Sequence, residues 1–180
     1  MTLQQAQALL TENKIPFAVC EYESEAAYWN CIDLFPYTKY AKDCKVIVLR
    51  IASNNGKKHI ELQFNAANGT FLFKELLFGT FCFEMFDYAE EMLESDLQNR
   101  INKIMSGSVV VIDTNDLTKK RWLSGGYFDL DEKDDDVFGR LGFENAMQKI
   151  EAPKGWLAKM LGCKKQYDIY DWNTYRCIIK

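Results

Sequence analysis

Polar and apolar residues alternate most regularly in the middle of the chain. Six consecutive positions alternate in the order His59, Ile60, Glu61, Leu62, Gln63 and Phe64. A period of two is typical of a β-strand with one apolar face and one polar face. The pattern therefore predicts a strand over 57–65, with the three apolar side chains in a core. We expect the polar face, including His59, to be exposed.

Neighbouring segments predict an antiparallel meander around this strand. Residues 45–52 are apolar on both faces, which is typical of a central strand. Asn55-Gly56 and Asn68-Gly69 are hairpin turn signals, because these residues adopt positive φ at low cost. Further strands are expected at 17–23, 70–78 and 80–86. The stretch 25–40 gives a mixed signal that does not separate a strand from a short helix.

Two helices have clear sequence signals. Thr2 and Gln5 form a capping-box pattern, which predicts a helix over about 2–13. Asp87 and Glu90 form a second such pattern, which predicts a helix over about 88–105. Its apolar stripe at helical spacing consists of Ala89, Leu93, Leu97, Ile101 and Ile104.

The last third of the chain predicts further strands and helices. We expect strands at 108–113 and 119–123, helices at about 134–150 and 154–161, and a terminal hairpin pairing 166–171 with 175–179. Ser124-Gly125-Gly126 resembles a phosphate-cradling turn only loosely, and a strand break or bulge is the favoured interpretation. The fold class expected is α+β: an antiparallel β meander packed with flanking α-helices, in a single domain spanning 1–180.

Charge is distributed unevenly along the chain. Its 22 Lys+Arg and 26 Asp+Glu give a formal net charge of −4, so no general attraction to nucleic acid is expected. Residues 129–136 (DLDEKDDD) contain six acids and one lysine. This run could be a solvated loop that stabilises the start of the next helix. It could instead meet a basic protein partner and speed the encounter.

The acidic run partly matches the sequence pattern of a calcium-binding loop. A loop starting at Asp134 would place Gly139 at the sixth position, as calcium-binding loops require. Position 12 would be Asn145, however, where a bidentate glutamate is needed. We therefore predict no metal site and no cofactor.

Catalytic signatures are weak. The single histidine, His59, excludes most histidine-based catalytic and zinc sites, and no two of the six cysteines form a C-x-x-C pair. The opening residues lack the features of a secretory signal, and no apolar run is long enough to span a membrane. We expect reduced thiols, a cytoplasmic location, no membrane association and no enzymatic activity.

Aromatic residues gather in two segments. Between Tyr22 and Tyr40 they are mixed with acids, and these rings could belong either to the core or to a protein interface. In residues 149–180, seven basic residues are interleaved with tyrosines and tryptophans. That mixture could track a single-stranded nucleic acid, although an amphipathic helix followed by a core hairpin is favoured.

The opening of the chain carries a resemblance to a known class of proteins. Residues 2–6 (TLQQA), 15–17 (IPF) and 22–29 (YESEAAYW), followed by a meander and helix over 45–105, resemble small, acidic immunity proteins of bacterial polymorphic-toxin systems. The resemblance implies a cytoplasmic protein that occludes a toxin's active or binding surface without catalytic residues. The basic C-terminal segment departs from the uniformly acidic members.

These observations favour a non-catalytic protein-binding domain, an immunity-type inhibitor whose partner is another protein such as a basic toxin domain. The alternatives are a small enzyme or ligand-binding domain with an unrecognised pocket, and a nucleic-acid-binding module that uses the basic C-terminal segment. The residues expected to bind the partner are Tyr28, Trp29, Asp131, Asp134, Asp135 and Asp136. The oligomeric state is left open.

Overall fold

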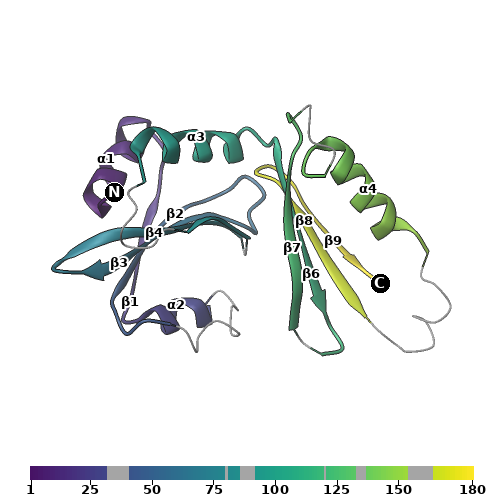
Figure 1. Ribbon diagram of the computed structural model, residues 1–180, viewed down its shortest axis with the longest axis horizontal. Coiled ribbons are helices and arrows are strands. Elements are labelled where there is room, and N and C mark those ends of the chain that lie inside the picture. The colour runs from purple at the N-terminus through teal and green to yellow at the C-terminus, as the bar shows by residue number, and fades with distance from the viewer. Residues whose placement is uncertain (32–40, 80, 86–91, 120, 133–136, 154–163) are drawn as a thin grey trace. The chain divides into compact units, whose positions relative to one another are not determined.

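The computed structural model describes residues 1–180 except 32–40, 80, 86–91, 120, 133–136 and 154–163. The chain is α+β, with helices and two antiparallel sheets (Figure 1). Its contacts group into two compact units, Met1–Asn102 and Lys103–Lys180, and each unit contains one sheet. The single domain expected over 1–180 stays a prediction.

The first unit contains the predicted meander. Its five strands are β1 (Ala18–Tyr22), β2 (Val46–Ile51), β3 (Ile60–Ala67), β4 (Thr70–Phe78) and β5 (Phe81–Met85). They lie in the order β1-β2-β3-β4-β5, and every neighbouring pair is antiparallel. Both predicted turn glycines, Gly56 and Gly69, have positive φ, as the Asn-Gly turn signals require.

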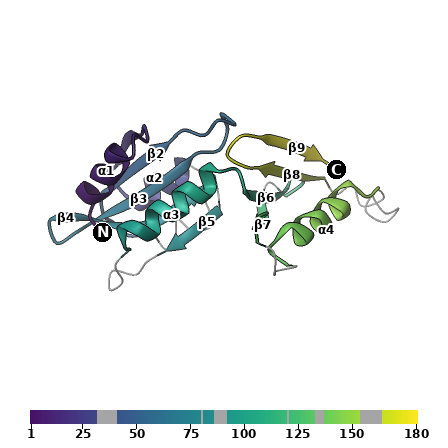
Figure 2. The same ribbon diagram turned by 90° about the horizontal axis from the view of Figure 1, so that it is seen from above.

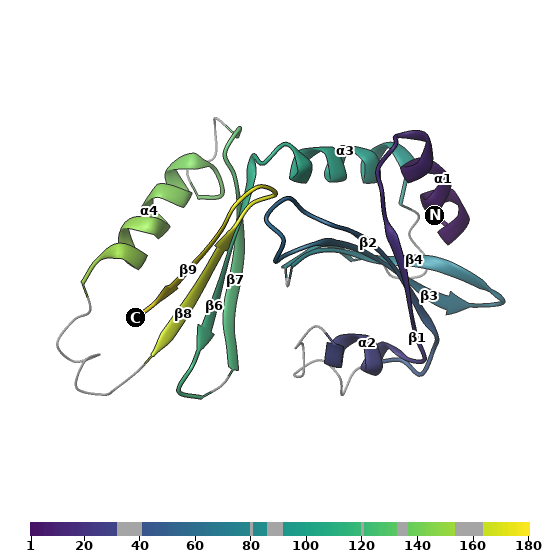
Figure 3. The ribbon, with the colours of Figure 1, turned by 180° about the vertical axis from the view of Figure 1, so that it is seen from behind.

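Helices lie on both faces of this sheet. Helices α1 (Leu3–Glu12) and α3 (Glu94–Met105) lie on one side, and α2 (Glu25–Cys31) lies on the other, as Figure 1 and the reverse view in Figure 3 show. Seen from above, α1 and α3 both run roughly along the direction of β2 and β3 (Figure 2). Both faces of β3 are therefore covered, and its residues 60–65 are all buried.

Helix α1 begins as the sequence predicts. The Thr2 hydroxyl accepts a hydrogen bond from the Gln5 backbone N–H at 3.3 Å, and the Gln5 side chain accepts one from the Thr2 backbone N–H at 2.7 Å. This reciprocal pair satisfies two backbone donors that a helix start leaves without intrahelical partners. The capping-box prediction is confirmed.

Helix α3 starts later than expected. It begins at Glu94, and Leu93, which the stripe placed in the core, is 60% exposed. The rest of the stripe is buried as predicted, at Leu97, Ile101 and Ile104. The second capping-box pair, Asp87 and Glu90, lies outside the described residues together with Ala89.

The second unit is a four-stranded sheet with one described helix. Its elements are β6 (Val109–Asp116), β7 (Arg121–Asp129), α4 (Arg140–Glu151), β8 (Lys165–Tyr170) and β9 (Tyr175–Ile179). The strand order is β7-β6-β8-β9, all antiparallel. The terminal hairpin is confirmed as β8 with β9. The helix expected at about 134–150 is α4, which begins later, at Arg140, since residues 137–139 form a turn. The helix expected at 154–161 lies outside the described residues.

Strand β7 corrects one prediction. Ser124-Gly125-Gly126 was expected to be a strand break or a bulge; no break occurs, because β7 runs continuously through it, paired with β6. The register shift lies between Thr114 and Asn115, so Leu123 is the extra residue of a bulge. Pairing with β6 supplies the backbone hydrogen bonds that hold the two glycines in an extended conformation despite their low strand propensity.

Candidate functional site

One side of the second unit combines exposed apolar and acidic side chains. We call it the acidic–apolar surface, and its described residues are Asp129, Asp131, Glu132, Val137, Phe138 and Leu141. Three of its side chains are large, apolar and more than half exposed, namely Val137, Phe138 and Leu141. The acidic residues 129–132 and the apolar residues 137–141 come from two segments that lie side by side, because the Asp129 N–H donates a hydrogen bond to the Phe138 carbonyl at 2.7 Å.

Two further contacts order this surface. The Phe138 ring stacks on Tyr127 with centroids 6.4 Å apart, and Arg140 donates to the Leu130 carbonyl at 3.3 Å. Phe138 is therefore held in place although 53% of it is exposed. An exposed aromatic ring held by neighbours is typical of an interface anchor, since little conformational freedom is lost on binding.

Lys103 pairs with the acids of the surface. Its ammonium lies 2.9 Å from Asp129 and 3.3 Å from Asp131. The hydrogen bond from Lys103 to Asp129 raises the pKa of the lysine. Hydrogen bonds from Ser108 and then Lys103 lower the pKa of Asp131. Asp131 is therefore ionised near neutral pH and contributes negative charge to the surface.

The structure separates the predicted partner-binding residues. Asp131 is exposed on the acidic–apolar surface of the second unit. Tyr28 and Trp29 lie on α2 in the first unit, where Tyr28 is fully buried and Trp29 partly buried. For Tyr28 the core alternative therefore applies, and the ring itself offers a partner no surface. Asp134, Asp135 and Asp136 lie outside the described residues.

Beneath α2 the first unit contains a buried polar cluster. Glu61 is 5% exposed and accepts two hydrogen bonds, from the Tyr28 hydroxyl at 2.8 Å and from Arg50 Nε at 2.7 Å. Burial first, and the Glu61 carboxylate second, raise the pKa of Tyr28. The cluster thus includes the Arg50–Glu61 ion pair, whose arginine is about one-third exposed.

A second carboxylate joins the same cluster from the first turn of α2. Glu25 is 2% exposed and accepts hydrogen bonds from the Gln63 amide at 3.3 Å, the Asn65 amide and the Lys42 backbone N–H at 2.7 Å. These are neutral donors, which offset the desolvation of the carboxylate. The side-chain amide oxygen of Gln63, Oε1, is buried without a hydrogen-bond partner among the described residues.

The third carboxylate, Glu75 on β4, has a raised pKa. It is 4% exposed, and burial, with a smaller contribution from the Glu25 charge, raises its pKa to about 7. Trp29 donates a hydrogen bond to it, and the Cys82 thiol lies 3.8 Å away. Glu75 therefore changes charge near neutral pH, which is a property of proton-transfer groups and of pH-sensitive elements.

The polar face of β3 corrects a second prediction. Glu61 and Gln63 were expected to be exposed, but both are buried because α2 covers their side of the sheet. His59, just before β3, is partly buried, and its Nδ1 accepts a hydrogen bond from the Ser53 N–H at 3.3 Å. Burial lowers the pKa of His59, and Arg50 adds to the effect.

The second unit has its own buried acids. Asp113 on β6 and Asp168 on β8 are register neighbours, and both are buried. Tyr170 donates to Asp113 at 2.9 Å, and Tyr175 donates to Asp168 at 2.7 Å. Burial first, and the bond to Asp168 second, raise the pKa of Tyr175. Tyr175 therefore stays protonated and acts as the hydrogen-bond donor to Asp168.

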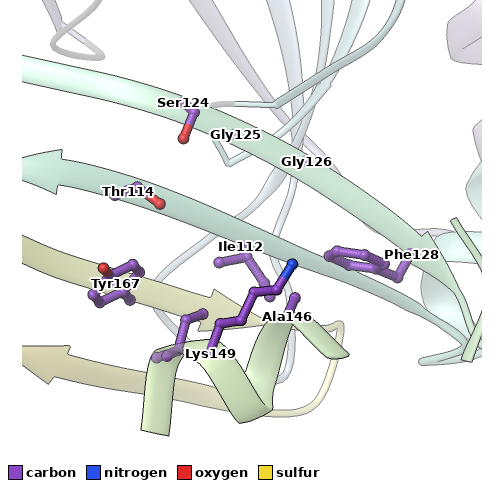
Figure 4. Close-up of a pocket in the computed structure, with 10 residues that line it drawn as sticks. Ile112, Thr114, Ser124, Gly125, Gly126, Phe128, Ala146, Lys149 and Tyr167 are labelled. Carbon is purple, nitrogen blue, oxygen red and sulfur yellow. The ribbon is translucent and has the colours of Figure 1, made fainter. Parts of the chain in front are cut away.

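A cavity of about 320 Å³ lies between α4 and the sheet of the second unit (Figure 4). Its walls combine apolar side chains, such as Ile112 and Phe128, with the hydroxyl groups of Thr114 and Ser124. Lys149 reaches it from α4. Sequence reasoning missed this site, although Ser124-Gly125-Gly126 was the segment that could have pointed to it.

Three structural findings limit the chemistry of the described residues. Among them, no group of three or more His, Cys, Asp or Glu side chains could hold a metal ion. The cysteines whose side chains are described, namely Cys20, Cys44, Cys82 and Cys177, are all free thiols. In this part of the chain, every helix is too short or too polar to cross a membrane.

Comparisons with known proteins identify no relative. No protein-family model, no curated protein and no solved structure matches the chain. The functional argument therefore depends on the residues and geometry described above.

Proposed function

We propose that the chain is a non-catalytic protein-binding domain that docks a basic protein partner through the acidic–apolar surface. The observation that supports this is the exposure of Val137, Phe138 and Leu141 directly beside Asp129 and Asp131. Contiguous apolar side chains exposed beside polar ones are typical of protein interaction sites.

The two kinds of residue have different roles in the proposed complex. The apolar side chains lose water on contact, and the ordered Phe138 ring supplies the central anchor. The acids lie beside this anchor and attract a positively charged partner, which raises the association rate more than the affinity. The partner that fits is therefore a basic protein with an apolar depression among its positive residues.

The resemblance of residues 2–6, 15–17 and 22–29, together with the meander and helix over 45–105, to immunity proteins gives the proposed partner a class, a basic toxin domain. In that proposal binding covers the active or binding surface of the toxin in the cytoplasm, and no residue of this chain performs chemistry. The nucleic-acid alternative depends on a segment whose lysines 154 and 159 lie outside the described residues.

The test uses the purified product of the gene immediately upstream as the partner. Replacing Asp131, Asp134 and Asp135 together with Asn should lower its association rate at low salt by about tenfold, measured by surface plasmon resonance. The difference should shrink as salt rises, since screening acts beyond a Debye length of about 8 Å near physiological ionic strength. The melting temperature should change little.

A matched control removes the same charge elsewhere. Glu12, Glu21 and Asp43 are exposed acids of the first unit, and their replacement with the corresponding amides should leave the association rate within about twofold. Phe138→Ala should speed dissociation without altering the salt dependence. If both triple variants slow association equally, the negative charge acts through the whole chain and the proposed surface is wrong.

A further inference from the structure

The cavity of the second unit exists because one strand position lacks a side chain. Gly126 lies in β7 opposite Ile112, on the side of the sheet that faces α4. A Cβ built at Gly126 would meet no atom within 4 Å. Ser124 and Phe128, two residues away in each direction, lie on the same face of the strand. The missing side chain therefore leaves open space between two filled positions, as Figure 4 shows.

The cavity is large enough for a small organic molecule. Its volume of about 320 Å³ lies at the lower end of the roughly 300–1,000 Å³ typical of ligand pockets. At about 30 Å³ per water molecule, it would hold about ten waters. An occupant of this size has one ring or a short aliphatic chain.

The lining of the cavity is apolar on one side and polar on the other. Ile112, Phe128 and Ile150 contribute apolar surface. Thr114, Ser124 and Tyr167 contribute hydroxyl groups. None of the described residues that line it is acidic, although the whole chain has a net charge of −4. The cavity therefore does not repel a negative charge from its own walls.

Lys149 supplies the one positive charge among these lining residues. It lies in the last turn of α4, and Figure 4 shows its ammonium extending from the helix toward the sheet, near Ile112 and Phe128. Within the described part of the chain, the ion pairs of the second unit involve other cations, namely Lys103 and Arg176. The Lys149 ammonium is thus placed beside apolar walls without an acidic partner from the described residues.

We propose that this cavity binds a small carboxylate with an apolar aliphatic or aromatic body. The ligand carboxylate pairs with the Lys149 ammonium, and its apolar body lies against Ile112 and Phe128. The hydroxyl groups of Thr114 and Ser124 remain available for water or for a polar substituent. The site lies at the C-terminal half of α4, away from the acidic–apolar surface residues at its start, so the inference does not depend on the proposed protein partner.

The experiment is an NMR titration of the uniformly ¹⁵N-labelled full chain with 3-phenylpropionate. We expect saturable shifts confined to amides around the cavity, including those of Gly125, Gly126 and Ile150. The neutral analogue 3-phenylpropan-1-ol should bind at least about tenfold more weakly, because a hydrogen bond to a charged group contributes more than a neutral one. Equal affinity for the two compounds would overturn the proposed role of the charge.

Three variants locate the binding. Lys149→Gln should weaken 3-phenylpropionate binding by about tenfold and leave 3-phenylpropan-1-ol binding unchanged. Lys165→Gln, which removes the same charge at the exposed start of β8, should have no effect on either. Gly126→Val should abolish binding of both, because its side chain occupies the open space. A folded Gly126→Val protein, judged by its spectrum, that still binds 3-phenylpropionate would overturn the site, as would absence of shifts in the unaltered chain.

Discussion

Two sheet faces in this molecule are each covered by a helix, and they are filled in opposite ways. The face beneath α2 in the first unit contains the buried carboxylates Glu25, Glu61 and Glu75. The face beneath α4 in the second unit is mainly apolar and retains a cavity beside Gly126. The same architecture therefore supports a dense network of ionisable groups in one unit and an open binding space in the other.

The two faces carry different free-energy penalties in the folded state. A buried carboxylate must be protonated, paired or hydrogen-bonded, because leaving water penalises its charged form. Glu61 is paired with Arg50, Glu25 accepts from neutral amides, and the pKa of Glu75 is raised. An apolar face with a cavity incurs no such penalty but forfeits packing contacts. The following experiments test whether these costs are real.

The largest effect is expected from Glu75→Gln. Because the folded-state pKa is about 7 against an ordinary value of 4.5, the folded chain holds this proton more tightly than the unfolded chain. The contribution of the protonated Glu75 carboxyl to the free energy of unfolding is fully present below about pH 4.5 and is lost as the pH rises through about 7. Gln cannot ionise, so the variant should be more stable than the unaltered chain by about 3 kcal/mol at pH 8.

Urea denaturation at several pH values measures this difference. The difference in the free energy of unfolding between the variant and the unaltered chain should be near zero at pH 4.5. It should grow up to about pH 7 and level off above it. Glu21→Gln, at an exposed position of β1, should produce no such pH-dependent gap. A constant difference across the whole range would mean that Glu75 ionises normally in the folded chain.

Arg50→Met should have the next largest effect, in the opposite direction. It removes the cation that faces Glu61 at 2.7 Å and leaves that carboxylate buried with the Tyr28 hydroxyl as its hydrogen-bond donor among the described side chains. Breaking a fully buried pair costs about 3–5 kcal/mol. We expect about 2 kcal/mol here, since the arginine side chain is about one-third exposed and solvent screens the pair.

The double variant Arg50→Met/Glu61→Gln separates charge from packing. The amide oxygen introduced at position 61 can still accept a hydrogen bond from the Tyr28 hydroxyl. The double variant should therefore recover at least half of the free energy of unfolding that Arg50→Met loses. Denaturation at pH 7 measures both variants. If the double variant is no more stable than Arg50→Met alone, the loss comes from the arginine's packing rather than from an isolated charge.

The smallest effect concerns the open face, where Gly126→Ala should stabilise the second unit by about 0.5–1 kcal/mol. The added methyl group meets no atom within 4 Å, and alanine loses less conformational entropy on folding than glycine. Gly107→Ala is the contrasting variant, because Gly107 has φ +81° and its added Cβ would lie 2.8 Å from Asn173 Nδ2. It should destabilise the chain, and thermal denaturation distinguishes the two outcomes.

The sequence predicted the first sheet well because its signals are local. Asn-Gly turns place consecutive strands side by side, and alternation fixes which residues share a face. Alternation also separated Glu61 and Gln63 from their apolar neighbours correctly. Alternation could not show that both faces are covered, because the polar face is covered by α2, whose Tyr28 lies 33 residues before its partner Glu61.

The candidate sites were predicted less well, for the same reason. The acidic run was visible in the sequence, but the exposure of Phe138 beside it depends on the contact between Asp129 and the Phe138 backbone. The two glycines of β7 were interpreted from local propensity as a strand break or a bulge. Pairing with β6 overrides that propensity. Gly126 is thereby placed in the strand beneath α4, where its missing side chain leaves open space.

The raised pKa of Glu75 has a consequence for calorimetry. Near pH 7 about half of the molecules carry a proton on this side chain, so the formal net charge of −4, which counts every carboxylate as ionised, overstates the negative charge. Any event that changes the surroundings of Glu75 will take up or release a fraction of a proton. The heat of unfolding at neutral pH should therefore differ between phosphate and Tris, because the buffer's own heat of ionisation enters the measurement.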